Sequence, residues 1–374
     1  MFGIVGGGTE FLLWTATLGA LVATVFHWHR VCVHNFRNIF IRVSAIFLIQ
    51  FLFVASLGVE LNKFGNFYSS WSDLLGLNND LSKVAISPQS LATISANDVM
   101  SAKRTPGGSL IFREIITGSA SNISNHVYVV ASPSISKILE NSVSPQLPTN
   151  YQVVELFPGY PGVPETWIGT LHGIETMENL EIAGKIPPTI AIIPSINVVR
   201  GLDTECLNIP GTSQVETWLT TDMRIFAQKF IGLDDRKWST FGYSTGGWCA
   251  AELAIRHTDI YQHAISLAGY FSPSFSAGVN KRERNVLMGD YDLAKIVKGQ
   301  ATNPDLLIMY SKSDKFSFSS MNKFIAGVGT SIPIKLVEIP HGGHNIKIWQ
   351  PFVQTGFNWL AQLSAPKTVE NKGN

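Results

Sequence analysis

The sequence is short of charge. Asp, Glu, Lys and Arg make up 15% of its 374 residues, against about 25% in an average globular protein. The two signs nearly cancel, because 28 basic residues face 27 acidic ones and leave a formal net charge of +1. Such a chain has no long-range attraction for nucleic acid or for acidic polymers. We therefore expect no nucleic acid among its partners.

Patterns that bind cofactors are also missing from the sequence. It contains no phosphate-cradling glycine loop, no dinucleotide fingerprint and no convincing cluster with metal-ligand spacing. The best candidate for a metal site is the group His27, His29, Cys32 and His34, which lies at the end of an apolar segment and has no second group of ligands. We interpret them as ordinary residues at the end of that segment, and expect neither a cofactor nor a metal.

Two long apolar segments near the N-terminus account for much of the missing charge. They run from about Phe11 to Trp28 and from about Val43 to Leu61, each close to the roughly 20 residues that cross a bilayer as a helix. A buried core helix would show a polar stripe, which these segments barely have. A cleaved signal peptide would begin with a basic region, which is absent. We predict a membrane anchor of two transmembrane helices in residues 1–62, in preference to a soluble helical hairpin.

The basic residues around these segments predict an orientation. Arg30, Arg37 and Arg42 lie in or beside the short connection, whereas residues 1–10 contain no Lys or Arg and only Lys63 follows the second segment closely. The positive-inside rule then places the connection in the cytoplasm. We expect a multi-pass protein of the cell membrane, in contact with the lipid bilayer, whose main domain is extracytoplasmic.

The rest of the chain divides by composition. Residues 63–107 are rich in Ser, Asn, Ala and Lys, and we interpret them as a linker with a short helix around Leu74–Leu81. Residues 366–374 form a tail. The part between them, residues 108–365, is predicted to be the main folded domain.

This domain opens with two strand-like segments, SLIFREIITG and HVYVVASP, separated by a turn-like stretch, which predicts an antiparallel hairpin. Short, nearly continuous apolar runs follow, of the kind that forms strands covered on both faces. Helix-like segments at 213–230 and 245–261 lie between them. The alternation predicts an α/β fold with a mostly parallel sheet flanked by helices. The apolar runs are YQVVELFPG, PTIAIIPSI, WSTFGYS, HAISLAG, DLLIMYSKSD and IKLVEIPHGG.

The segment WSTFGYSTGGWCA contains the pattern G-x-S-x-G centred on Ser244. The pattern alone often marks a Gly-Ser turn, but here an apolar strand precedes it and an Ala-rich helix follows. That context is typical of a nucleophile elbow, in which a serine occupies a strained strand-to-helix turn between small neighbours. We predict that Ser244 is a catalytic nucleophile.

A serine hydroxyl needs a general base, and in α/β-hydrolases the acid and then the histidine follow the serine along the chain. Asp314 ends an apolar run, where a strand-end loop presents a carboxylate; Asp305 precedes that strand, and Glu338 lies inside the next one. Two histidines compete for the role of base. We favour His344 over His341, because the two glycines before His344 allow its backbone to swing toward the serine.

An oxyanion hole requires two backbone N–H groups that point at the substrate carbonyl oxygen. One is expected from Thr245, directly after the nucleophile. The loop LFPGYPG after an early strand is placed to supply the other, and Tyr160 is our candidate there; a plain Pro/Gly turn is the alternative.

The sequence has three cysteines, of which Cys32 belongs to the predicted cytoplasmic connection. Cys206 and Cys249 would lie in an oxidising compartment if the main domain is extracytoplasmic. Such a compartment permits a disulfide between them. Two buried free thiols are the alternative.

With these motifs in place, the chain resembles the esterase family of α/β-hydrolases that includes esterase D, feruloyl and enterochelin esterases and actinobacterial mycolyltransferases. The resemblance covers about residues 108–362 and depends on GYSTGG, on the acid after DLLIMYSKS, and on GGHN followed by Trp349. Pro158 and Gly159 stand where esterase D usually has His-Gly. The chain looks most similar to membrane-bound actinobacterial members, which carry N-terminal spans, a D-T-E-C segment (Asp203–Cys206 here) and a cysteine just after the elbow.

The resemblance implies an α/β-hydrolase fold, with a triad of Ser244, Asp314 and His344 and oxyanion donors at Tyr160 and Thr245. It also implies that Cys206 and Cys249 meet. The expected activity is that of a serine esterase or acyltransferase, which forms an acyl-enzyme from an ester and passes the acyl group to water or to a hydroxyl acceptor. Lipid or cell-envelope esters suit a membrane-tethered site. The alternative is a non-catalytic binding or scaffold protein that keeps the fold.

A cap over this site is expected from residues 271–304. Its Lys281, Arg282 and Arg284 are positioned to meet an anionic group, but we interpret them as a solvated, charged helix face.

Overall fold

The computed structural model describes residues 7–28, 35–65, 94–142, 145–199, 201–275, 278–339 and 343–364. The chain forms two compact units, residues 1–85 and 86–374, each of which we describe by itself. The helix predicted around Leu74–Leu81 lies outside the described residues.

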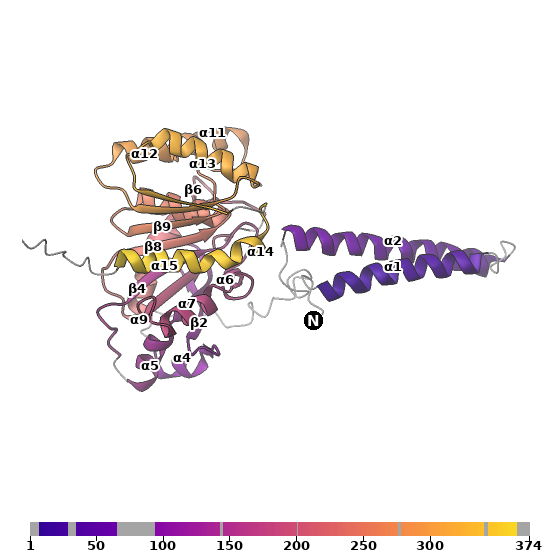
Figure 1. The fold of residues 1–374 in the computed structure, drawn as a ribbon, viewed down its shortest axis with the longest axis horizontal. Coiled ribbons are helices and arrows are strands. Elements are labelled where there is room, and N and C mark those ends of the chain that lie inside the picture. Colours follow the sequence, from indigo (N-terminus) through magenta and orange to yellow (C-terminus); the bar gives the residue numbers. More distant parts are fainter. Residues whose placement is uncertain are drawn as a thin grey trace, which may run out of the picture. The chain divides into compact units, whose positions relative to one another are not determined.

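The first unit contains two antiparallel helices, α1 (Gly7–His27) and α2 (Phe36–Gly65) (Figure 1). They contact each other through the rings of Trp14 and Phe53, whose centroids are 5.9 Å apart, and through the hydroxyls of Thr17 and Ser56, 3.4 Å apart. Both helices are long and apolar enough to cross a membrane, and only 6% of each apolar window is buried inside the structure. A core helix of a soluble protein would be mostly buried, so these two helices leave their apolar surface for another environment.

At the connection between these helices, Arg42 contacts Trp28. Its guanidinium lies 4.4 Å from the centre of the indole ring and donates a hydrogen bond of 2.7 Å to the Trp28 carbonyl oxygen. A predicted cytoplasmic arginine is therefore also a bridge between the two helix ends.

In the described part of the second unit, nine strands form one sheet in the order β1-β2-β3-β5-β4-β8-β9-β10-β11. The pairings β1–β2, β2–β3 and β3–β5 are antiparallel, and all pairings from β5 to β11 are parallel. The predicted hairpin is β2–β3, and the mostly parallel sheet is confirmed. The strands are β1 (Lys103–Arg104), β2 (Leu110–Thr117), β3 (Ser124–Ala131), β4 (Gln152–Phe157), β5 (Thr189–Pro194), β8 (Trp238–Tyr243), β9 (Tyr261–Leu267), β10 (Asp305–Tyr310) and β11 (Ile334–Glu338).

The central strands are buried on both faces, which explains their continuous apolar sequences. In β4, Val153 and Phe157 point into one core cluster, and Val154 and Leu156 point into the other. This alternation follows from the two-residue repeat of a strand. Each fully buried side chain of this size contributes roughly 1.5–3 kcal/mol to folding, so the centre of the sheet is a rigid base for the loops at its ends.

Helices cover both faces of this sheet (Figure 1). Helices α7 and α15 pack together on one face, while α9, α10 and α12 contribute to the core on the other. A short two-stranded ribbon pairs β6 (Asn208–Ile209) with β7 (Ser213–Gln214). The helices are α4 (Ala96–Ser101), α5 (Pro133–Asn141), α6 (Glu165–Ile168), α7 (Gly173–Ile182), α8 (Val215–Thr217), η3 (Trp218–Asp222), α9 (Met223–Ile231), α10 (Thr245–Arg256), α11 (Lys281–Asp290), α12 (Leu293–Gly299), α13 (Lys315–Val328), α14 (Ile346–Trp349), η4 (Gln350–Phe352) and α15 (Val353–Ser364).

Two predicted boundaries need correction. Helix α4 and strand β1 lie within the stretch 63–107 that we interpreted as a linker, and β1 pairs with β2, so the folded domain begins before Gly108. The helix-like segment 245–261 ends as a helix at Arg256, and Tyr261 already begins β9. The polar residues Arg256 to Asp259 occupy this boundary, and a polar stretch of that length also fits the exposed face of a continuing helix.

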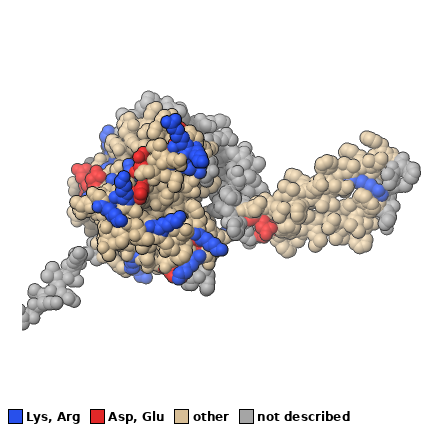
Figure 2. Space-filling model, turned by 90° about the horizontal axis from the view of Figure 1, so that it is seen from above, with Lys and Arg blue, Asp and Glu red and all other residues tan. Residues whose placement is uncertain are grey.

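The segment that we interpreted as a cap contains α11 and α12. Lys281 and Arg282 on α11 are exposed. Arg284 instead donates a hydrogen bond of 2.9 Å to the Phe275 carbonyl oxygen. Figure 2 looks down on this side of the domain, where Lys and Arg side chains are scattered among fewer acidic ones. A cap over the site remains a prediction.

Candidate active site

Ser244 lies in the turn between β8 and α10, at the carboxyl end of the parallel strands. Its backbone has φ +58° and ψ −121°, a strained conformation for a residue with a side chain. The two glycines of the motif are required by close backbone approach. A Cβ atom on Gly242 would collide with the backbone of Gly246, and one on Gly246 with the backbone that ends β4. The geometry is that of a nucleophile elbow.

The structure brings the three predicted triad residues together. The Oγ atom of Ser244 is 2.6 Å from Nε2 of His344, and Nδ1 of His344 is 2.5 Å from Oδ2 of Asp314. A carboxylate accepts hydrogen bonds and does not donate them, so it fixes the proton on Nδ1. Nε2 is then free to accept the proton of the serine hydroxyl.

Asp314 is suited to remain charged in this arrangement. Burial by itself would raise the pKa of its carboxyl group. The hydrogen bond from His344 and its electrostatic attraction, together with the backbone N–H of Ser317, outweigh that effect and lower the pKa of Asp314 below its usual range. The Ser317 N–H donates to the carboxylate because Asp314 also caps the N-terminus of α13. A charged Asp314 stabilises an imidazolium at His344.

The competing residues lie elsewhere. Asp305 begins β10, at the opposite end of the strand, and its carboxylate is 3.2 Å from Nδ1 of His263. Glu338 ends β11 and forms an ion pair of 2.9 Å with Lys312. His341 lies outside the described residues.

The two predicted oxyanion donors belong to segments that border the nucleophile. Thr245 is buried at the first position of α10, and its hydroxyl oxygen lies 3.1 Å from the Tyr270 hydroxyl oxygen, within hydrogen-bond distance. Tyr160 follows Gly159 in the loop between β4 and α6. A Cβ atom placed on Gly159 would lie 3.2 Å from Cβ of Ser244. The helix N-terminus adds positive potential where an oxyanion would form.

Cys206 and Cys249 are joined by a disulfide, with their Cα atoms 5.7 Å apart. The bond attaches the D-T-E-C segment to helix α10, behind the nucleophile. Both cysteines are fully buried.

Glu205, beside this disulfide, is a residue that sequence reasoning missed. Its carboxylate accepts hydrogen bonds from the Tyr270 hydroxyl at 2.7 Å and from the N–H groups of Ser274 and Phe275 at 3.0 and 2.8 Å. Burial, helped by the negative charge of Asp203, raises the pKa of Glu205 to about 8. Glu205 thus connects the disulfide segment, through Tyr270, to Thr245. A glutamate inside D-T-E-C was visible in the sequence, but its partners come from a distant segment.

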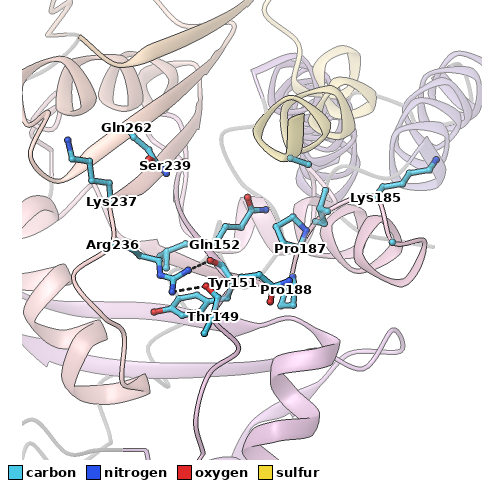
Figure 3. A pocket seen from close by; sticks show the side chains of 15 residues that line it. Thr149, Tyr151, Gln152, Lys185, Pro187, Pro188, Arg236, Lys237, Ser239 and Gln262 are labelled. Atoms are coloured by element: carbon cyan, nitrogen blue, oxygen red, sulfur yellow. Dashed lines mark hydrogen bonds between the residues drawn. The ribbon is translucent and has the colours of Figure 1, made fainter. Parts of the chain in front are cut away.

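A separate hollow of about 700 Å³ lies at the opposite edge of the sheet, where the parallel strands begin (Figure 3). Arg236, one of the cations that line it, already has hydrogen-bond partners within the protein. The guanidinium donates to the backbone carbonyls of Tyr151 and Thr149 and to the Asp234 carboxylate. Since the carboxyl ends of parallel strands carry Ser244 and the amino ends carry this hollow, the two are on different edges of the domain, and the hollow plays no part in the site. Within the described residues, no group of His, Cys, Asp or Glu side chains is arranged to hold a metal ion.

Comparison of the sequence with known proteins finds a distant relative. No protein-family model matches the chain. An uncharacterised protein of Corynebacterium glutamicum is 27% identical over 232 residues, which cover 56% of this chain and 52% of that protein. The chain thus matches only about half the length of this curated relative.

Several solved structures have a similar fold. An S-formylglutathione hydrolase from Agrobacterium tumefaciens has a TM-score of 0.56 at 16% identity, with 71% of this chain and 99% of that chain covered. A ferulic acid esterase has a TM-score of 0.55 at 16% identity, covering 68% and 98%. MPT51 of Mycobacterium tuberculosis has a TM-score of 0.51 at 13% identity, covering 68% and 99%. The second unit therefore has the α/β-hydrolase fold, and its structural neighbours are of the esterase types that its motifs resemble.

Proposed function

We propose that the chain is a serine esterase or acyltransferase that works through an acyl-enzyme at Ser244. The observation that supports this most directly is the continuous chain of hydrogen bonds from Ser244 through His344 to Asp314, at 2.6 and 2.5 Å. In an ordinary Gly-Ser turn, nothing would place the serine hydroxyl within hydrogen-bond distance of a histidine that is itself oriented by a buried carboxylate. This arrangement is the one that activates a serine as a nucleophile.

In the proposed reaction, His344 removes the proton from Ser244 as the oxygen attacks the ester carbonyl. The N–H groups of Tyr160 and Thr245 stabilise the oxyanion of the tetrahedral intermediate. His344 then gives its proton to the leaving alcohol, and the acyl group stays on Ser244. Water or a hydroxyl acceptor, deprotonated by the same imidazole, then attacks the acyl carbonyl. The bond between the carbonyl carbon and Ser244 breaks, and His344 returns its proton to the serine oxygen. Water makes the protein an esterase and an alcohol makes it an acyltransferase.

The first experiment is labelling of the purified full chain with a fluorophosphonate probe, which reacts covalently with activated serines. We expect strong labelling of the parent, none of Ser244→Ala, and a large loss in His344→Ala. A folded parent that stays unlabelled would instead support the alternative function, a binding or scaffold protein of the same fold.

We further propose that α1 and α2 anchor the protein in the cell membrane, with the second unit on the extracytoplasmic side, where lipid or envelope esters are within reach. The length and apolar exposure of both helices support the anchor, and the arginines at their connection support the orientation. Reporter fusions after residue 62 and between residues 30 and 40 test it. A cytoplasmic signal after residue 62 would reject the orientation.

A further inference from the structure

Asn197 lies just beyond the end of β5 and contacts the loop between β4 and α6. Its side-chain Nδ2 donates hydrogen bonds to the carbonyl oxygens of Gly162, at 2.5 Å, and Gly159, at 3.4 Å. Both partners are acceptors, so the amide must present its NH₂ group to them. The segment that carries Asn197 is itself fixed, because the Thr204 hydroxyl donates to the Ile196 carbonyl oxygen at 3.0 Å.

The loop that Asn197 holds passes directly over the nucleophile. A Cβ atom on Gly159 would lie 3.2 Å from Cβ of Ser244 and 3.6 Å from its Oγ. The peptide group between Gly159 and Tyr160 is therefore at the position from which one of its polar atoms can reach an atom bonded to the serine.

Which polar atom points there depends on Asn197. The cis peptide bond in this loop is Tyr160–Pro161, and the Gly159–Tyr160 bond is trans, so its C=O and N–H point in opposite directions. Asn197 holds the Gly159 carbonyl on its own side. The Tyr160 N–H is consequently turned away from Asn197. If this peptide were flipped, a carbonyl oxygen would replace the donor and would repel an oxyanion.

We propose that Asn197 is a positioning residue for catalysis, which keeps the Gly159–Tyr160 peptide in the orientation that offers the Tyr160 N–H to the oxyanion. This inference rests on the proposed function at Ser244. Asn197 thus orients one of the two proposed oxyanion donors. The other donor, the N–H group of Thr245, is held by its own helix.

The test is Asn197→Asp, which keeps the shape of the side chain but replaces the donor by oxygen and sets a negative charge against two carbonyls. Hydrolysis of p-nitrophenyl butyrate by the full chain in detergent is the assay. Loss of one oxyanion donor lowers kcat by about 100- to 1,000-fold, and we expect a loss of this order with KM changed little. Asn197→Ala, which removes the donor without adding charge, should lose less but in the same direction.

A second readout separates positioning from a general loss of structure. A trifluoromethyl ketone forms a tetrahedral oxyanion on the active serine, so its affinity should fall in parallel with kcat/KM across the Asn197 variants. Asn303 supplies a matched control, because its Nδ2 also donates to two carbonyls, those of Val297 at 3.1 Å and Ser331 at 2.9 Å. Asn303→Asp should lower thermal stability and leave kcat and ketone affinity unchanged.

The outcomes are distinguishable. If Asn197→Asp keeps kcat within threefold of the parent, or loses no more than Asn303→Asp, the role of Asn197 is rejected while the proposed function stands. If the folded parent shows no turnover that depends on Ser244, the proposed function and this inference are rejected together.

Discussion

The hydroxyl of Tyr243 donates a hydrogen bond of 3.0 Å to the backbone carbonyl oxygen of His344. Their rings are also stacked, with centroids 5.7 Å apart and planes inclined by 26°. The residue directly before the nucleophile thus holds the loop that presents the base. Trp349 adds a second hydrogen bond, from Nε1 to the Gly343 carbonyl oxygen at 3.0 Å. With its backbone held from two sides, His344 keeps its ring free for Ser244 and Asp314.

Tyr243→Phe should lower kcat about 3- to 10-fold. The substitution keeps the ring but removes a hydrogen bond whose net contribution is about 0.5–1.5 kcal/mol, so His344 is presented less often in the reactive position. The measurement is kcat and KM for p-nitrophenyl butyrate. Tyr151→Phe is the control, because the Tyr151 hydroxyl accepts a hydrogen bond of 3.1 Å from Asp234 at the other edge of the sheet. Unchanged kcat in Tyr243→Phe would show that the contact does not position the base.

Asp314→Asn should lower kcat by about 10⁴, the effect known for loss of the carboxylate in a Ser-His-Asp triad. Asparagine is as good a helix N-cap as aspartate, so α13 should remain folded and the loss should come from the histidine tautomer. Asp292→Asn is a matched control, because Asp292 caps α12 by accepting from the Lys295 N–H at 3.2 Å. That variant should keep full activity. A loss of less than tenfold in Asp314→Asn would require a different acid.

Much of the fold was predictable because its signals are local. The two-residue alternation and apolar runs located the strands, and the G-x-S-x-G pattern between a strand and a helix located Ser244. Asp314 and His344 followed from chain order and from their places after strands. The strands and Ser244 need only a few neighbouring residues, and the choice of Asp314 and His344 adds only their order along the chain after Ser244.

The residues that hold the site in place were not predictable, because their roles depend on contacts across the sheet. Asn197 follows a strand as many loop residues do, and only the fold shows that it meets Gly159. Tyr243 occupies a position of the motif that tolerates many residues, and its partner is 101 positions away in the sequence. Glu205 contacts Tyr270, 65 positions later. No pattern in one sequence reveals such pairs.

Removal of the disulfide should destabilise the second unit without changing the triad. The bond closes a loop between cysteines 43 positions apart, for which the loss of chain entropy in the unfolded state predicts about 4 kcal/mol at most, with measured values commonly 2–4 kcal/mol. We expect Cys206→Ala/Cys249→Ala to unfold at lower temperature and, while folded, to keep the fluorophosphonate reaction. Dithiothreitol should lower the unfolding temperature of the parent but not of the double variant. Equal stability of the two proteins would mean that the bond adds nothing to folding.

Glu155 should make stability fall as pH rises, and Glu155→Gln should remove that dependence. Its carboxyl group is fully buried in β4, with Oε2 accepting a hydrogen bond of 2.7 Å from the Tyr261 hydroxyl and Oε1 without a partner among the described residues. Burial raises its pKa from 4.5 to about 8. Between these values the folded protein keeps a proton that the unfolded chain releases. The free energy of unfolding therefore falls by up to about 1.4 kcal/mol per pH unit.

Glutamine keeps the acceptor for Tyr261 and does not titrate, so the variant lacks this slope. From pH 5 to pH 8 its stability should rise relative to the parent by up to about 4 kcal/mol. Urea unfolding followed by tryptophan fluorescence at several pH values measures the difference. Glu205, whose pKa is also raised to about 8, is present in both proteins and cancels. Parallel pH profiles for parent and variant would show that Glu155 is ionised in the folded state, and water or another group would then have to stabilise its charge.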